Sequence, residues 1–138
     1  MRKKKQTSRK TRAKKIMPSR KYVNKILDWC VKTYGKSRYN REFPEIHYRS
    51  SSYLGEDRMT LAFYDDQDGI IYINKDDHKN LNVLANTIIH EYTHYKQNMR
   101  HYDILSMYLP YHRNPLEIEA NKVARRDAKK CVKDILSA

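Results

Sequence analysis

Apolar residues recur every three or four positions in three segments of the chain, a spacing that places them on one face of a helix. The first segment stops at Gly35, a residue suited to ending a helix, and its apolar positions are Tyr22, Val23, Ile26, Leu27, Cys30, Val31 and Tyr34. The second, residues 78–99, contains no Gly or Pro, and Asp76 or Asp77 would cap its first turn. The third runs from Leu116 to Leu136.

Alternation of apolar and polar residues predicts three short strands between the first two helices. They are residues 46–49, the stretch from Met59 to Tyr64, and residues 70–74. Residues 65–69, Asp-Asp-Gln-Asp-Gly, are typical of a turn, so the last two strands should pair as a hairpin. The pattern predicts one α+β domain, with an N-terminal helix, a three-stranded antiparallel sheet, a helix, a connecting segment at residues 100–114, and a C-terminal helix.

The second predicted helix carries the pentapeptide His90-Glu91-Tyr92-Thr93-His94. Residues four apart on a helix lie one above the other, so His90 and His94 can present ring nitrogens to one metal ion. Glu91 lies beside the first of them, where its carboxylate can take a proton from a metal-activated water. The pattern indicates a catalytic zinc site, in which three protein ligands leave one position open.

Together with the downstream sequence Glu117-Ile118-Glu119-Ala120-Asn121, the pentapeptide resembles the gluzincins, whose HExxH motif is followed by a glutamate ligand on a second helix. The likeness spans about residues 70–130 and is strongest to the minimal members, the minigluzincins, and to short phage-encoded HExxH proteins. It implies a zincin-like fold, Zn²⁺ as cofactor and hydrolysis of peptide bonds. It also implies that Ile70–Asn74 or its neighbour is an edge strand that pairs with an extended peptide substrate.

Two glutamates compete for the role of third ligand. Successive helical residues turn by about 100°, so Glu117 and Glu119 face nearly opposite sides and only one can meet the metal. Glu117 shares its face mainly with small residues, which would let the two helices approach closely: Ala120, Asn121, Ala124 and Ala128. We therefore expect Glu117 as ligand, with Glu119 as the alternative. Asn121 could accept the remaining N–H of a ligating histidine through its amide oxygen.

The connecting segment is rich in His and Tyr. A hydroxyl or imidazole from it could stabilise the oxyanion formed during hydrolysis, and Tyr111 and His112 are the candidates. His112 is also the main rival for third ligand, with His101 behind it, because Spartan-type DNA-repair proteases hold zinc with three histidines. His101 lacks the glycine turn of the extended metzincin motif, which disfavours it.

Charge is distributed unevenly along the chain. Residues 1–21 hold eleven Lys and Arg and no acid, whereas the remainder holds eighteen basic and sixteen acidic residues. We expect residues 1–18 to be a disordered basic arm ahead of a peptidase domain at residues 19–138. The arm would bind nucleic acid or another polyanion without base stacking, or serve only for solubility or targeting. The cations proposed for that contact are Arg2, Lys3, Lys4, Lys5, Arg9, Lys10, Arg12, Lys14 and Lys15.

Two function classes remain open at this point. The first is a zinc-dependent metallopeptidase acting on a peptide or protein substrate. The alternative is a nucleic-acid-associated binding protein that retains the peptidase scaffold with little turnover.

The two cysteines, Cys30 and Cys131, each fall in an apolar stripe and are expected to be buried free thiols. With no apolar run of membrane-spanning length, the expected location is the cytoplasm, that of a bacterial host if the protein is phage-encoded.

Overall fold

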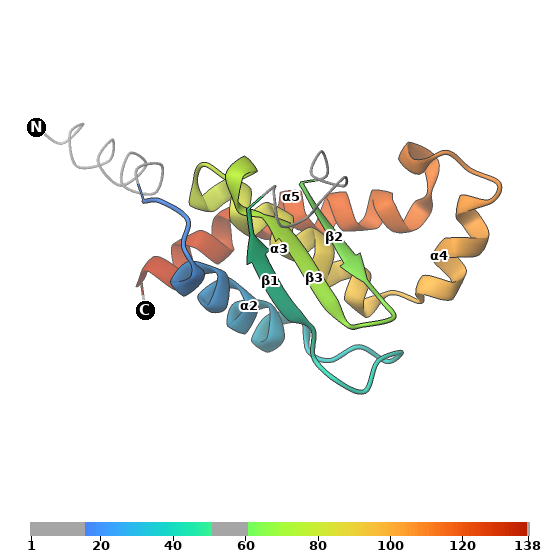
Figure 1. The fold of residues 1–138 in the computed structure, drawn as a ribbon, viewed down its shortest axis with the longest axis horizontal. Coiled ribbons are helices and arrows are strands. Elements are labelled where there is room, and N and C mark those ends of the chain that lie inside the picture. The colour runs from blue at the N-terminus through green and yellow to red at the C-terminus, as the bar shows by residue number, and fades with distance from the viewer. Residues whose placement is uncertain (1–15, 51–60, 138) are drawn as a thin grey trace, which may run out of the picture.

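The computed structural model describes residues 16–50 and 61–137 and shows an α+β fold with a small mixed sheet (Figure 1). The helices are α2 (Arg20–Tyr34), α3 (Leu81–Lys96), α4 (Met99–Ser106) and α5 (Pro115–Ser137). The strands are β1 (Glu45–Arg49), β2 (Ala62–Asp65) and β3 (Ile70–Asn74). A 3-10 turn, η2 (Lys75–Asp77), lies between β3 and α3, and a second, η3 (Tyr111–Arg113), lies between α4 and α5. The predicted helices and strands are therefore confirmed in kind, while their bounds and the direction of one strand pairing differ.

The sheet is mixed, so the predicted all-antiparallel arrangement is wrong. Its order is β1-β3-β2, with β1 parallel to β3 and β2 antiparallel to it. The predicted hairpin is confirmed, and its turn ends at Gly69, whose φ of 70° favours glycine. The central place goes to β3 because Ile70, Ile71 and Ile73 make it apolar on both faces, whereas its charged neighbours suit the edges. The strand predicted at the sheet edge was Ile70–Asn74 or its neighbour. Ile70–Asn74 is the central strand, whereas its neighbour β2 lies at an edge of the sheet.

Helix α3 packs on the sheet, α5 packs against α3, and α2 lies alongside β1 (Figure 1). Their shared core contains Val23, Ile26 and Cys30 from α2, Ile71 and Ile73 from β3, and Leu84, Ile88 and Tyr92 from α3. The hydroxyl of Tyr92 donates to the carbonyl of Gly35 at 2.6 Å, which fixes the end of α2 on α3. Within the described residues, no helix is long and apolar enough to cross a membrane.

The start of α3 differs from the prediction. Asp76 and Asp77 lie in η2, and the cap of α3 is Asn80, whose side chain accepts a hydrogen bond from the Val83 amide at 3.0 Å. The chain turns at His78, which is buried and donates from Nδ1 to the carbonyl of Asn74 at 2.6 Å. Such a turn needs the backbone to leave the helix, so α3 begins at Leu81, later than caps at Asp76 or Asp77 would imply.

The far end of α3 stops at Lys96 rather than continuing to residue 99. Gln97 has an extended backbone, with φ of −87° and ψ of 160°, and Asn98 caps α4 by accepting from the His101 amide. The connecting segment then reaches Asn114, whose side chain caps α5 by accepting from the Leu116 amide at 3.0 Å. A short break after the second histidine therefore separates α3 from α4.

The basic arm predicted from residues 1–18 falls mostly outside the described part of the chain, as do all nine cations assigned to it. Of its last three residues, Ile16 is half-buried and packs against the core. Both cysteines are buried free thiols, as expected.

Candidate metal centre

The pentapeptide lies in the second half of α3, and its two histidines face the start of α5. α3 and α5 form the most extensive contact between any two described elements. Ala120, Ala124 and Ala128 are buried along α5, and these small side chains allow the backbones of the two helices to approach closely. That contact brings the start of α5 against His90 and His94.

Three side-chain atoms converge at this contact. Oε1 of Glu117 lies 3.0 Å from Nε2 of His90 and 3.0 Å from Nε2 of His94, and the two nitrogens are 3.2 Å apart. The side chains of His94 and Glu117 are each 5% exposed and that of His90 is 15% exposed. The three atoms thus form a nearly equilateral triangle that is largely shielded from solvent.

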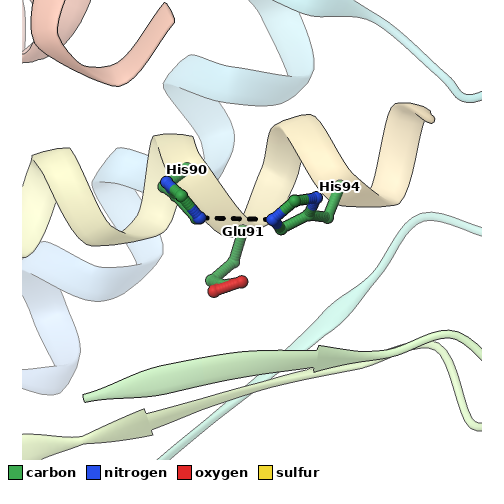
Figure 2. A group of neighbouring side chains, drawn as sticks. All are labelled: His90, Glu91 and His94. Carbon is green, nitrogen blue, oxygen red and sulfur yellow. Dashed lines mark hydrogen bonds between the residues drawn. The ribbon is translucent and has the colours of Figure 1, made fainter. Parts of the chain in front are cut away.

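The triangle matches the donor set of a tetrahedral metal site. For ligand distances of about 2.0–2.1 Å, the edges of a tetrahedron are about 3.3 Å, slightly longer than the separations found here. The rings of His90 and His94 stand at 79° to each other, with both Nε2 atoms directed to the same point, and Glu91 extends from between them toward the strands (Figure 2). One ligand atom each from His90, Glu91 and His94 lie within 4.8 Å of one another, close enough to hold a metal ion.

Gln97 holds His94 from the other side. Its Oε1 accepts a hydrogen bond from Nδ1 of His94 at 2.7 Å, which leaves Nε2 as the nitrogen that faces Glu117. Its Nε2 donates to the carbonyl of Leu116 at 2.9 Å and to Oε1 of Glu119 at 3.0 Å. Gln97 therefore ties the second histidine to the first turn of α5.

The two glutamates consequently take different positions. Glu117 is buried at the triangle, whereas Glu119 is exposed and contacts Gln97. Asn121 was predicted to accept the remaining N–H of a ligating histidine, but its side chain is exposed on α5. In His94, the acceptor of that N–H is Gln97. The structure thus brings Glu117 to both histidines, and neither Glu119 nor Asn121 is brought to them.

The connecting segment contributes two tyrosines on the Glu117 side. The hydroxyl of Tyr102 on α4 donates to Oε2 of Glu117, the oxygen that does not face the histidines. Tyr111 on η3 is 63% exposed, and burial of its hydroxyl together with the charge and hydrogen bond of Glu117 raises its pKa. His112 and His101 are exposed on η3 and α4. The hydrogen bond from Tyr102 leaves Glu117 with one oxygen, Oε1, directed at the histidines.

Charges at the centre are strongly coupled. Burial alone would raise the pKa of Glu117, but hydrogen bonds from His90, His94 and Tyr102 hold that pKa well below its usual range. Burial acts to lower the pKa of His94, yet the nearby carboxylates of Glu117 and Glu91 raise it overall. Burial raises the pKa of Glu91 despite the opposing effect of the two histidines. Glu117 is therefore anionic at neutral pH, and Glu91 is a stronger proton acceptor than an exposed glutamate.

Sequence reasoning missed Gln97 and Tyr102. A glutamine three residues after His94 was the only available signal for the first, and its role depends on α3 ending at Lys96. Tyr102 was one of several aromatic residues in a segment whose path could not be derived from periodicity. A surface pocket at the N-terminal end of α2, bordered by Ser19, Arg20, Arg49 and Lys75, includes none of the residues of the metal centre.

Comparisons of the chain with protein-family models, with curated proteins and with solved structures found no match. The function must therefore be argued from the chemistry of the centre.

Proposed function

We propose that this protein is a zinc-dependent metallopeptidase of gluzincin type. The observation that carries the proposal is the triangle of His90 Nε2, His94 Nε2 and Glu117 Oε1, with sides of 3.0–3.2 Å. Two neutral imidazoles and one carboxylate form a donor set that zinc uses in catalytic sites, where three protein ligands leave one position for water or substrate. A purely structural zinc site would be expected to have four protein ligands.

Each surrounding side chain has a definable part in this proposal. His90, His94 and Glu117 would hold the ion, which would acidify a water molecule and polarise a substrate carbonyl. Glu91 accepts the proton of the attacking water on its carboxylate and delivers it to the leaving nitrogen. The raised pKa of Glu91 suits both steps, because a carboxylate must hold the proton before releasing it. The hydroxyl of Tyr111 is a candidate hydrogen-bond donor to the oxyanion, with His112 on the same turn.

An extended peptide is the substrate class that best suits the surroundings of the centre. β2 is an edge strand, and its Tyr64 meets Tyr95 of α3 edge to face at 6.1 Å between ring centroids, so the edge lies beside the motif helix. Edge strands bind extended peptides through backbone hydrogen bonds, which makes main chain rather than a particular side chain the recognised feature. We therefore propose peptide or protein substrates.

The deciding experiment measures metal content and peptide hydrolysis on the same samples. The purified protein should contain about one zinc per chain by mass spectrometry and should cleave an unfolded protein such as reduced casein. Glu91→Gln should retain the zinc and lose at least about 100-fold in rate, the lower range for removing a general base. A variant that cleaves as fast as the parent refutes the role of Glu91. Retained zinc without any cleavage by the parent favours the alternative, a binding protein on a peptidase scaffold.

A further inference from the structure

The net charge of +13 is confined to two parts of the chain. Residues 1–15 contain nine Lys and Arg and no acid, and residues 120–138 contain six Lys and Arg and two acids. Residues 16–119 contain fourteen of each sign and are neutral. The body of the protein therefore carries no net charge, and the second half of α5 carries an excess of four cations.

The α5 cations occupy one face of the helix. They are Lys122, Arg125, Arg126, Lys129, Lys130 and Lys133, and all six are exposed. At about 100° per residue they fall within an arc of about 140°, opposite the buried stripe of Glu117, Ala124 and Ala128. Every residue of that arc between positions 122 and 133 is Lys or Arg. We call this arc the basic face of α5.

The two acids of this part of α5 are directed toward α2. Asp127 accepts a hydrogen bond from the hydroxyl of Tyr34 at 2.6 Å, and Asp134 accepts one from the indole of Trp29 at 2.9 Å. Asp127 also pairs with Arg126 at 2.8 Å. The acids therefore serve mainly to fix α5 on α2, and only one of the six cations is paired with them.

The basic face extends to the end of the molecule at which α2 begins. The contacts of Trp29 with Asp134 and of Tyr34 with Asp127 show that α2 and α5 are antiparallel, so α2 begins where α5 ends. Figure 1 shows this end, with the start of α2 in blue beside the last turns of α5 in red. In the sequence, the nine cations of residues 1–15 precede this end of α2.

We propose that the basic face of α5 binds the phosphate backbone of a nucleic acid duplex without reading its sequence. The face from Lys122 to Lys133 is about 17 Å long, which corresponds to about five base-pair steps. It has no aromatic side chain to stack on unpaired bases, which favours a duplex over a single strand. It also lacks the bulky apolar residues with which surface helices enter a lipid bilayer.

A duplex on this face leaves the metal centre accessible. Glu117 faces the opposite side of α5, and Lys133 is sixteen residues further along, about 24 Å at 1.5 Å per residue. Nucleic acid bound on one side of α5 and a peptide bound on the other would not compete for the same atoms. The protein could therefore act on substrates that are themselves bound to nucleic acid.

The test measures binding of the full chain to a fluorescent 20-base-pair duplex by anisotropy at several salt concentrations. The variant changes Lys122→Gln, Lys129→Gln and Lys133→Gln together. Each phosphate contact contributes about 0.9 to the slope of log K against log salt, so the slope should fall in magnitude by about 2–3. Affinity near 0.1 M salt should fall at least about 10-fold, since each lost contact no longer releases a counterion.

The matched control changes three exposed cations of the neutral body, Lys32→Gln, Lys79→Gln and Arg100→Gln, and should leave slope and affinity close to those of the parent. Replacing the three α5 lysines by Arg should also preserve both, because the charge is kept. Equal losses in the α5 variant and the control would refute the proposal. So would tighter binding of the parent to phosphatidylglycerol vesicles than to duplex at equal phosphate concentration.

Discussion

The side-chain oxygen of Gln97 accepts a hydrogen bond, 2.7 Å long, from Nδ1 of His94, which lies three residues earlier in the chain. The amide nitrogen of the same side chain donates to the carbonyl of Leu116 in the first turn of α5. A ligating histidine whose second nitrogen is hydrogen-bonded in this way is fixed in both tautomer and ring direction. We expect Gln97→Ala to lower zinc affinity about 10-fold to 100-fold, the usual effect of removing such a partner.

Competition with a chromogenic zinc chelator measures this loss. Asn121→Ala is the matched control. Asn121 is an exposed amide near the start of α5, so its removal should leave the zinc affinity at the level of the parent. A larger loss in Asn121→Ala than in Gln97→Ala would show that the two side chains had been assigned to each other's roles.

The choice between the two glutamates is open to the same measurement. Glu117→Gln removes the anionic oxygen 3.0 Å from both histidines and should weaken zinc binding by more than about 100-fold, beyond the range for partners outside the coordination shell. Glu119→Gln keeps an acceptor for Gln97 and should retain nearly full zinc content by mass spectrometry. The reverse result, with zinc lost only from Glu119→Gln, would overturn the ligand assignment.

Contact between α3 and α5 should be sensitive to side-chain volume. Ala124 is fully buried between the helices, so Ala124→Leu forces extra atoms into a filled space and should destabilise the fold by about 1–3 kcal/mol. Urea unfolding followed by circular dichroism measures the change. Arg125→Leu, at the next and exposed position, should stay within about 0.5 kcal/mol of the parent. If both variants unfold alike, the helices do not approach as closely as described.

Buried His78 should make stability depend on pH. Burial lowers its pKa, although the Asn74 carbonyl and the charge of Asp77 oppose the effect, and it is further held by Thr87 at 2.9 Å. The unfolded chain therefore binds a proton more readily, from about pH 6.5 downward. The contribution of neutral His78 to stability is therefore fully present above that pH and is lost as the pH falls toward the pKa of His78 in the folded state.

Comparison with His78→Gln isolates this contribution. The variant should be less stable at pH 7.5, because it loses ring contacts, but the stability difference from the parent should shrink between pH 6.5 and 5. Urea unfolding at each pH, with zinc chelated throughout so that His94 titrates alike in both proteins, gives the difference. A constant gap over that range would mean that His78 titrates normally in the folded protein.

Periodicity predicted most of the fold. Helical stripes gave α2, α3 and α5 because each buries one face, and Gly35 ended α2 where its φ of 77° requires glycine. The order of the sheet was not predictable from alternation, since a period of two identifies a strand but not its neighbours. The central place of β3 follows from residues 70–73 being apolar on both faces, a feature visible in the sequence but interpreted there only as one strand of an antiparallel sheet.

The metal centre likewise has some features that the sequence predicts and others that it does not. The spacing of His90 and His94 on one helix is a local property, and the 100° rotation per residue separates Glu117 from Glu119 once a helix is assumed. The positions of Gln97 and Tyr102 depend instead on where α3 ends and how α4 returns toward α5, which no local pattern encodes. Long-range contacts of this kind appear only in three dimensions.

The two thiols provide an internal reporter of global opening. Cys30 on α2 and Cys131 on α5 are both fully buried, and burial raises the pKa of Cys131 to about 12 and that of Cys30 well above its usual range. Neither sulfur is a thiolate at neutral pH in the native state, so a disulfide reagent added in solution can react only after α2 separates from α5. The labelling rate of this protein should accordingly track the population of molecules whose helices have come apart, with no engineered probe required.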